Sequence, residues 1–162
     1  MNIAFTGHRD FPHEKYHLKL SALIEQRALT NTTLTLWCGM AVGFDMSAAE
    51  CAIELRTKYP HIEVVGVVPF RDQPDLFSQK QREEYFRLLD LCDRVEVLSE
   101  EYTPRVYHQR NDYLLAHCDE LVAFHNGSKK GGTAYTVTKA RRLKILTTNL
   151  FEDIQQKIPG LF

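Results

Sequence analysis

Two patterns of hydrophobic and polar residues alternate along the chain. Short apolar runs recur at intervals, and between them lie longer stretches in which apolar residues return every three or four positions. The short runs predict strands, and the longer stretches predict helices. The predicted strands are 2–5, 34–38, 62–68, 94–98, 120–124 and 144–148, and the predicted helices are 14–27, 43–58, 79–91, 106–117 and 134–142, followed by a terminal amphipathic segment.

Strands and helices that alternate in this way predict a three-layer α/β/α fold with a mostly parallel, doubly wound sheet. The run 62–68 is almost wholly apolar, which is typical of a parallel strand covered on both faces. In the first helix we expect Leu18, Leu20, Leu23 and Ile24 to supply the core face. At 162 residues the chain can bury one substantial core, so we expect a single domain over residues 1–162.

Composition and charge argue against several classes of protein. The chain carries 20 Lys and Arg against 21 Asp and Glu, so no global basic field would attract nucleic acid, which we do not expect as a partner. The 4 cysteines lie far apart without a C-x-x-C pair, which predicts reduced thiols. The sequence has no signal-like segment and no apolar run long enough to span a membrane, and therefore predicts a cytoplasmic protein without a membrane partner.

The stretch Cys38–Asp45, which reads C-G-M-A-V-G-F-D, joins a predicted strand to a predicted helix. Gly39 ends the strand and Gly43 opens the helix, so free backbone N–H groups and the positive end of the helix dipole reach one edge of the sheet. A phosphate could dock there. Asp45 would repel a phosphate placed against it, so its role is either to offset the helix dipole or to accept ribose hydroxyls. The second role favours a ligand that contains a nucleoside.

Two other strand-end turns carry similar chemistry, Thr6-Gly7-His8-Arg9 and Gly131-Gly132-Thr133. Because the carboxyl ends of parallel strands share one edge of a sheet, we expect the three turns to converge on a single crevice. Arg9 could clamp a phosphate, and Thr6 or Thr133 could donate a hydroxyl. The glycines of each turn also have a purely conformational explanation. Arg110 and Asn111 fall early in the predicted helix 106–117, from which they point either into the crevice or to solvent.

Two local motifs resemble sites that we do not expect here. His13-Glu14-Lys15-Tyr16-His17 formally matches the zinc-protease pattern H-E-x-x-H, but it lies at a helix start and no obvious third ligand follows. Gly127–Thr133 resembles a phosphate-binding P-loop, although Gly132 stands where that motif requires lysine, and there is no G-x-G-x-x-G sequence. Lys129 and Lys130 either reach an anion or belong to a solvated loop. We therefore predict no metal and no cofactor.

Five motifs occur along the chain in the order T-G-H-R, C-G-M-A-V-G-F-D, V-P-F with Gln73, Tyr102 with Q-R-N-D, and G-G-T. This series resembles the SLOG superfamily and, within it, the YpsA-like branch, which is related to the Lonely Guy phosphoribohydrolases and to the DNA-processing protein A. The resemblance implies a Rossmann-like sheet and a homodimer. It also implies that a nucleotide-derived small molecule is bound by Thr6, Gly7, His8, Arg9, Gly39, Met40, Ala41, Gly43, Asp45, Pro69, Phe70, Gln73, Tyr102, Arg110, Asn111, Gly131, Gly132 and Thr133.

The resemblance leaves three functions to compare. Lonely Guy enzymes carry P-G-G-x-G-T-x-x-E, and in the matching stretch Thr136 stands in place of the glutamate. A hydroxyl cannot replace a carboxylate as general acid or base near neutral pH, so binding that senses or sequesters a nucleotide is the leading hypothesis. The alternative is a hydrolase of the N-glycosidic bond in a nucleoside monophosphate, with Arg110, Asp45 and Glu50 as catalytic residues. Single-stranded DNA binding is disfavoured by the net charge of -1.

Overall fold

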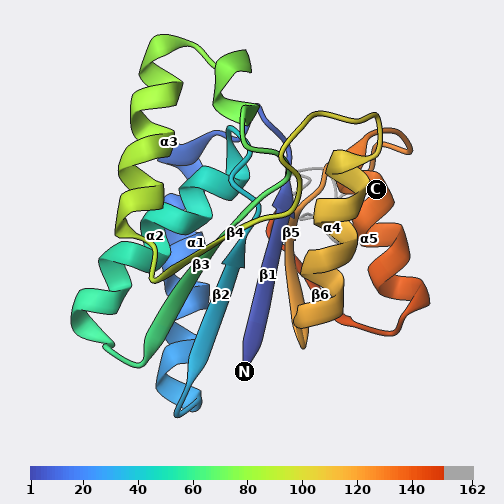
Figure 1. Ribbon diagram of the computed structural model, residues 1–162. Coiled ribbons are helices and arrows are strands. Elements are labelled where there is room, and N and C mark those ends of the chain that lie inside the picture. Colours follow the sequence, from blue (N-terminus) through green and yellow to red (C-terminus); the bar gives the residue numbers. More distant parts are fainter. Residues whose placement is uncertain (152–162) are drawn as a thin grey trace.

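The structure is a computed structural model that describes residues 1–151 (Figure 1). The elements follow the order β1 (Asn2–Gly7), α1 (His13–Thr30), β2 (Leu34–Cys38), α2 (Phe44–Lys58), β3 (Ile62–Val68), the 3₁₀ helix η1 (Gln73–Leu76), α3 (Gln79–Leu91), β4 (Arg94–Val97), α4 (Val106–His117), β5 (Glu120–Phe124), α5 (Gly132–Arg142) and β6 (Leu146–Asn149). The amphipathic segment predicted at the end of the chain lies outside the described residues.

The strands form one parallel sheet of six, in the order β4-β3-β2-β1-β5-β6. Two layers of helices enclose this sheet, with α1, α2 and α3 on one face and α4 and α5 on the other (Figure 1). The Rossmann-like α/β fold expected from the alternating pattern is therefore confirmed. From β1 the chain turns toward β2, whereas from β5 it turns the opposite way toward β6. Ligands of such sheets bind at the carboxyl ends of the strands where the order reverses.

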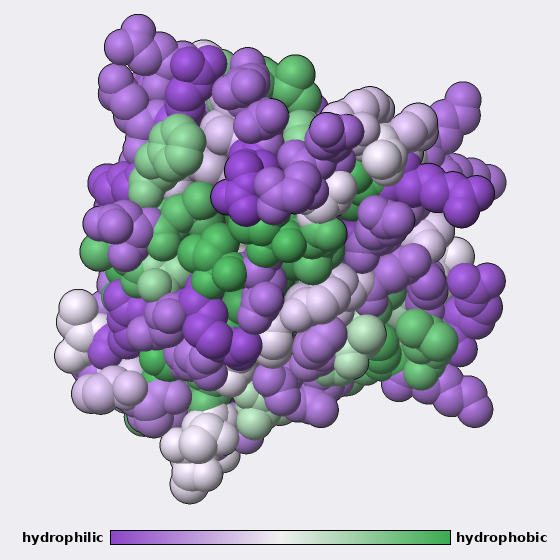
Figure 2. All heavy atoms as spheres, viewed as in Figure 1, coloured by the Kyte–Doolittle hydropathy of each residue, from purple (hydrophilic) through white to green (hydrophobic). Residues whose placement is uncertain are grey.

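Burial along the strands follows their position in the sheet. In β3 every residue except Glu63 is buried, as its apolar sequence predicts for a strand covered on both faces. At the edge, β4 leaves Val95 and Val97 partly exposed. Helices α4 and α5 cover only part of their face of the sheet, and hydrophobic residues gather in a band between α3 and α4 on the surface seen in Figure 2. Part of that face is covered by the Arg94 guanidinium, which lies 5.3 Å from the centre of the Trp37 ring.

The core face of α1 differs from the one expected from the leucines. Tyr16, Leu20, Ile24 and Ala28 are buried at a regular spacing of four residues. Leu18 lies two positions from this row, which places it on the opposite side of the helix, and it is 73% exposed. The assignment of Leu18 to the core was therefore wrong. Leu20 and Ile24 are in the core, and Leu23 packs against it while staying partly exposed.

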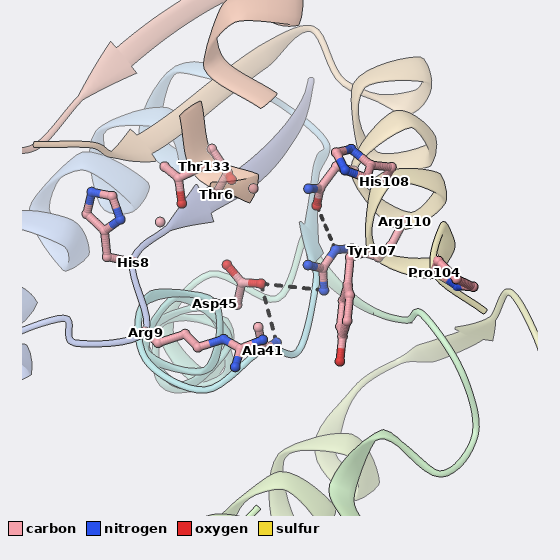
Figure 3. Close-up of a pocket in the computed structure, with 13 residues that line it drawn as sticks. Thr6, His8, Arg9, Ala41, Asp45, Pro104, Tyr107, His108, Arg110 and Thr133 are labelled. Atoms are coloured by element: carbon pink, nitrogen blue, oxygen red, sulfur yellow. Dashed lines mark hydrogen bonds and ion pairs between the residues drawn. The ribbon is translucent and has the colours of Figure 1, made fainter. Parts of the chain in front are cut away.

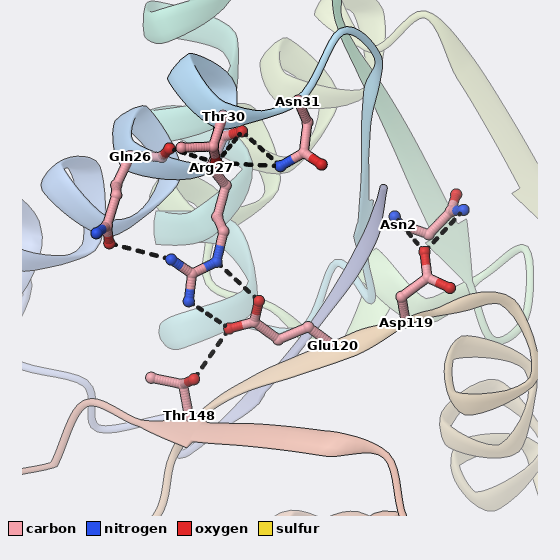
Figure 4. A network of polar contacts seen from close by, with 8 residues as sticks. All are labelled: Asn2, Gln26, Arg27, Thr30, Asn31, Asp119, Glu120 and Thr148. Carbon is pink, nitrogen blue, oxygen red and sulfur yellow. Dashed lines mark hydrogen bonds and ion pairs between the residues drawn. The ribbon is translucent and has the colours of Figure 1, made fainter.

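A buried ion pair fastens the end of α1 to the sheet at the edge opposite the strands' carboxyl ends (Figure 4). The Arg27 guanidinium donates to both carboxylate oxygens of Glu120, at 2.8 and 2.9 Å, and the Thr148 hydroxyl donates to the same carboxylate at 2.9 Å. Glu120 is fully buried. This network joins α1, β5 and β6, and its geometry is the two-pronged one that arginine offers a carboxylate. Within residues 1–151, no helix is both long and apolar enough to cross a membrane.

Candidate functional site

A cleft with a volume of about 370 Å³ opens at the carboxyl ends of the strands, where the sheet order reverses (Figure 3). Four segments that are far apart in the sequence line it: the end of β1, the turn between β2 and α2, the start of α4 and the start of α5. The lining residues are Thr6, Gly7, His8, Arg9, Ala41, Asp45, Pro104, Tyr107, His108, Arg110, Asn111, Gly132 and Thr133. The expected convergence of three strand-end turns is present in the structure.

The glycines of the β2–α2 turn shape the cleft without forming its wall. A Cβ atom on Gly39 would lie 2.8 Å from Oδ2 of Asp45 and 3.1 Å from Nη1 of Arg110, so only glycine lets both charged groups come this close. Gly43 has φ +94, and a Cβ there would collide with the backbone carbonyl of Arg9. For these two residues the conformational explanation therefore accounts for the sequence.

Asp45 lies at the floor of the cleft in the first turn of α2 and is 4% exposed. Its Oδ2 accepts the backbone N–H of Ala41 at 3.3 Å and lies 3.9 Å from Nη1 of Arg110. The other carboxylate oxygen points toward Thr6 and Thr133 (Figure 3). Burial raises the pKa of Asp45 to about 6, although Arg110, the Ala41 N–H and Arg9 oppose the rise. Asp45 is thus mostly ionised at neutral pH and close to its titration range.

Arg110 is the buried cation beside Asp45. It is 7% exposed, donates from Nη1 to the carbonyl of Gly39 at 2.5 Å, and donates from Nε to Oδ1 of Asn111 at 2.8 Å. Burial lowers the pKa of Arg110, and the Asp45 carboxylate partly offsets this effect. A guanidinium keeps its proton under such conditions. The site therefore holds a fixed cation whose orientation is set by the β2–α2 turn and by its neighbour on α4.

Three helix N-termini reach the cleft without a side-chain cap. The N-cap residues are Gly43 for α2, Arg105 for α4 and Gly131 for α5, and none of them makes a capping hydrogen bond through its side chain. The first N–H groups of a helix have no partner inside the helix, and the dipole favours negative charge at this end. Gly132 and Thr133, which line the cleft, belong to the first turn of α5. At the start of α2 the N–H groups of Phe44 and Met46 donate to the carbonyls of His8 and Ala41, and in α4 that of Val106 donates to the carbonyl of Thr103. The start of α5 is therefore the helix end that suits an anion best.

Two imidazole rings stand on the walls of the cleft. Nε2 of His8 accepts the backbone N–H of Asn126 at 3.0 Å, so neutral His8 carries its proton on Nδ1. The ring of His108 contacts the ring of Tyr135 edge-on, with centroids 4.3 Å apart. In Figure 3 His8 lies at the left of the cleft, and His108 lies across from it on α4. The cleft thus combines cationic, neutral and anionic hydrogen-bonding groups.

The structure brings more than half of the expected binding residues together. Those that line the cleft are Thr6, Gly7, His8, Arg9, Ala41, Asp45, Arg110, Asn111, Gly132 and Thr133. Pro104, Tyr107 and His108 also line it, and we had not predicted them as binding residues. The spacing along α4 offered a signal, because Tyr107 lies three positions before Arg110 and His108 lies three positions before Asn111, so each pair shares a helix face.

Other expected residues lie away from this cleft. Gly39 and Gly43 sit within the turn, and the fully buried Met40 packs into the core with φ 58. The remaining ones follow β3, β4 and β5. Pro69 directly follows β3, and the rings of Phe70 and Tyr102 pack with their centroids 5.5 Å apart. Gln73 lines an adjoining cavity. Gly131 lines a separate hollow on α5 with Lys129 and Lys139. The ring contact of Phe70 and Tyr102 gives both residues a packing role.

Only some of the residues expected to act in the hydrolase line the cleft. Asp45 and Arg110 line the cleft, but Glu50 does not, because it lies further along α2 and accepts a hydrogen bond from Arg87 of α3 at 2.9 Å. Thr136 is fully buried, and its hydroxyl donates to the carbonyl of Gly132 at 2.8 Å. The position of the expected glutamate is thus held by a side chain that bonds to its own helix.

The H-E-x-x-H motif lies at the start of α1. The rings of His13 and His17 stack with centroids 5.0 Å apart, and Nδ1 of His13 shares a hydrogen bond of 3.0 Å with the hydroxyl of Ser47. In the described part of the chain, residues 1–151, no three or more His, Cys, Asp or Glu side chains are grouped so that they could hold a metal ion. The two histidines therefore have structural partners on α1 and α2.

Comparison with known proteins adds a family to this geometry. The family model for YpsA, described as the YspA SLOG family, matches residues 13–153. The SPbeta prophage-derived protein YoqJ of Bacillus subtilis is 30% identical over 125 residues, which cover 70% of this chain and 73% of YoqJ. UPF0398 proteins are similar as well. One from Halalkalibacterium halodurans is 26% identical over 72% of this chain and 67% of the relative. One from Bacillus licheniformis is 25% identical over 86% of this chain and 82% of the relative. The resemblance read from the motifs is confirmed, and the chain belongs to the YspA SLOG family.

Proposed function

We propose that the cleft binds a nucleotide or a nucleotide-derived small molecule, which the protein senses or sequesters. The observation that carries the proposal is the meeting of the α5 N-terminus with two arginines, Arg9 and Arg110, around one buried carboxylate, Asp45. Backbone N–H groups and guanidinium groups recognise phosphate, and a carboxylate accepts hydroxyl groups. A nucleotide supplies both kinds of partner in one molecule.

The phosphate would lie near Arg9 and the start of α5. Arg9 is exposed at the mouth of the cleft, so its guanidinium is free to close on an incoming anion. Gly132 and Thr133 present the first turn of α5, and the Thr133 side chain supplies a hydroxyl donor. Arg110 is held by Gly39 and Asn111, so its contribution is a fixed positive field beneath the site.

The ribose would lie over Asp45. One oxygen of this carboxylate is used by Ala41 and Arg110, whereas the other points into the cleft toward Thr6 and Thr133 (Figure 3). A hydroxyl group that donates to the open oxygen makes a charge-assisted hydrogen bond. A bare phosphate would instead be repelled by the same oxygen. This arrangement supports a sugar phosphate over inorganic phosphate.

Calorimetric titration with AMP, ADP, ADP-ribose and a cyclic dinucleotide tests the proposal. We expect at least one of these ligands to bind, and Arg9→Ala to weaken its binding by about 10- to 100-fold, since a hydrogen bond to a charged group contributes about 1.5–3 kcal/mol. Arg141→Ala, which removes an equal charge from an exposed site at the end of α5, is the matched control and should leave the affinity unchanged. Absence of binding across the panel would refute the proposal.

A second candidate function is hydrolysis of the N-glycosidic bond of a nucleoside monophosphate. It is favoured by the raised pKa of Asp45, about 6, because acids and bases in active sites have pKa values near the working pH. Incubation with AMP should then release adenine, and Asp45→Asn should abolish the release. If AMP binds and no adenine forms, hydrolysis is refuted while binding stands.

A further inference from the structure

A second cavity of about 320 Å³ adjoins the cleft. The two share Arg9, Ala41 and Tyr107, so these residues form the boundary between them. The second cavity extends toward η1 and the start of α3, and its other lining residues are Asp10, Val42, Gln73, Leu76, Phe77 and Gln81. A single ligand could therefore occupy both cavities across Arg9 and Tyr107.

Gln73 is the distinctive group of this second cavity. It is 2% exposed, and its backbone N–H donates to the carbonyl of Phe70 at 3.1 Å, which fixes it at the start of η1. Its side-chain oxygen is buried and has no hydrogen-bond partner among residues 1–151. Buried polar atoms of proteins almost always have such a partner. Gln81, the other glutamine, already uses its side-chain oxygen to accept the backbone N–H of Ser78 at 2.9 Å.

The surroundings of Gln73 differ from those of the cleft. Val42, Leu76, Phe77 and the ring of Tyr107 give this cavity apolar walls, and Leu76 leaves 70% of its surface exposed. A flat aromatic group would pack against such walls. An amide at one side would pair with a hydrogen-bonding edge of that group, as glutamine does with bases. Apolar walls with a few placed polar groups are typical of sites for small ligands.

We propose that this second cavity receives the base of the nucleotide, whose ring packs beside Tyr107 and whose edge donates an N–H to the side-chain oxygen of Gln73. This inference rests on the proposed function, because the sugar phosphate occupies the cleft on the other side of Arg9. The terminal amide torsion of glutamine is soft, so a modest rotation turns the buried oxygen toward the ligand. Gln73 thereby acts in recognition of the base, while Arg9 and Asp45 bind the part common to all nucleotides.

Calorimetry with AMP, GMP, CMP, UMP and ribose 5-phosphate tests the inference. We expect at least one nucleotide to bind about tenfold or more tightly than ribose 5-phosphate, which lacks the base. Gln73→Leu should remove most of this preference and leave the affinity for ribose 5-phosphate unchanged. Gln26→Leu, at an exposed glutamine of α1 beside the opposite edge of the sheet, is the control and should change neither affinity.

The outcomes separate the inference from the proposed function. If ribose 5-phosphate and all four nucleotides bind equally, or if Gln73→Leu weakens all of them alike, the base site is refuted and sugar phosphate binding stands. If none of them binds, the base site is refuted, and the titrations with ADP, ADP-ribose and the cyclic dinucleotide decide the proposed function. Should Gln73→Leu not fold, the wild-type protein still gives an answer through nuclear Overhauser effects, which we expect between base protons and the side chains of Tyr107 and Leu76. Because Tyr107 borders both cavities, Leu76 decides the outcome, and base effects that do not include Leu76 would overturn the inference.

Discussion

Asp45 makes the pH dependence of stability a sensitive test of the electrostatics of the cleft. Two effects compete at this carboxylate, since burial disfavours its charge and Arg110 at 3.9 Å favours it. Burial is the larger effect, and the pKa rises from an ordinary 3.8 to about 6. The native protein therefore binds a proton at Asp45 more tightly than the unfolded chain does.

The sign and size of the effect follow from linkage. Between pH 4 and pH 6 the unfolded chain has lost the proton of Asp45 and the native state has kept it, so the free energy of unfolding falls as the pH rises through this window. Each unit of pKa difference corresponds to about 1.4 kcal/mol, so the full shift is worth roughly 3 kcal/mol. This stability is present below the unfolded pKa and is lost above the native one.

Urea unfolding of the wild type and of Asp45→Asn, from pH 4 to pH 8, measures this contribution. The protein has 1 tryptophan, the largely buried Trp37, whose fluorescence reports unfolding. Because other groups titrate equally in both proteins, the difference between their unfolding free energies isolates Asp45. We expect the stability of the wild type relative to Asp45→Asn to fall by about 2.5 kcal/mol from pH 4 to pH 8, slightly less than the full shift because pH 4 lies near the unfolded pKa. Asp90→Asn, an exposed carboxylate of α3, is the control and should shift the free energy by less than about 0.5 kcal/mol.

Two results would refute this reasoning. A difference that stays constant from pH 4 to pH 8 would mean that Asp45 titrates alike in the native and unfolded states. A difference that grows with pH would mean that Arg110 outweighs burial and that the carboxylate is an ordinary ion-pair partner. In either case Asp45 would not be a group poised to titrate in the cleft.

Two further substitutions test the packing that supports the site. Arg27→Met leaves Glu120 buried without its cation and should lower the free energy of unfolding, measured in urea, by about 3 kcal/mol. Adding Glu120→Leu should restore most of the lost stability. A loss below about 1 kcal/mol for Arg27→Met would contradict the importance of this pair. Gly43→Ala should lower the free energy of unfolding, measured by thermal unfolding, by more than about 2 kcal/mol, because φ +94 and the carbonyl of Arg9 both oppose a Cβ. Its control, Gly127→Ala, with φ +89 and open space around the Cβ, should lower it by about 1 kcal/mol. Equal losses in the two variants would show that the carbonyl contact is unimportant.

The sequence predicted the order of strands and helices because burial repeats with the period of each element. Strands β2, β3 and β5 match the predicted bounds residue for residue, as do α3 and α4. Leu18 was misplaced because the four apolar residues expected on the core face of α1 can form a row in more than one way. The packing of Tyr16 against the core shows which face is buried. The strand order within the sheet depends on long-range pairing, which the alternating pattern does not encode.

The cleft was predictable as a place and only in part as a set of side chains. The end of each parallel strand fixes where its turn lies, so Arg9, Asp45 and Thr133 were found. Side-chain direction depends on backbone torsions that the sequence does not reveal: at Met40 the positive φ accompanies a side chain buried in the core. Tyr107, on the boundary between the two cavities, was missed as a lining residue although its helical spacing to Arg110 and Asn111 indicated a shared face.

The most direct test of nucleotide binding in the cleft is a titration followed by amide ¹⁵N–¹H spectra, with AMP, ADP, ADP-ribose and a cyclic dinucleotide added in turn. We predict saturable shifts for at least one ligand, largest at the amides of Ala41, Gly132 and Thr133, which line the cleft. Shifts confined to the edge around Arg27 and Glu120, or no saturable shift with any of the four ligands, would contradict the account.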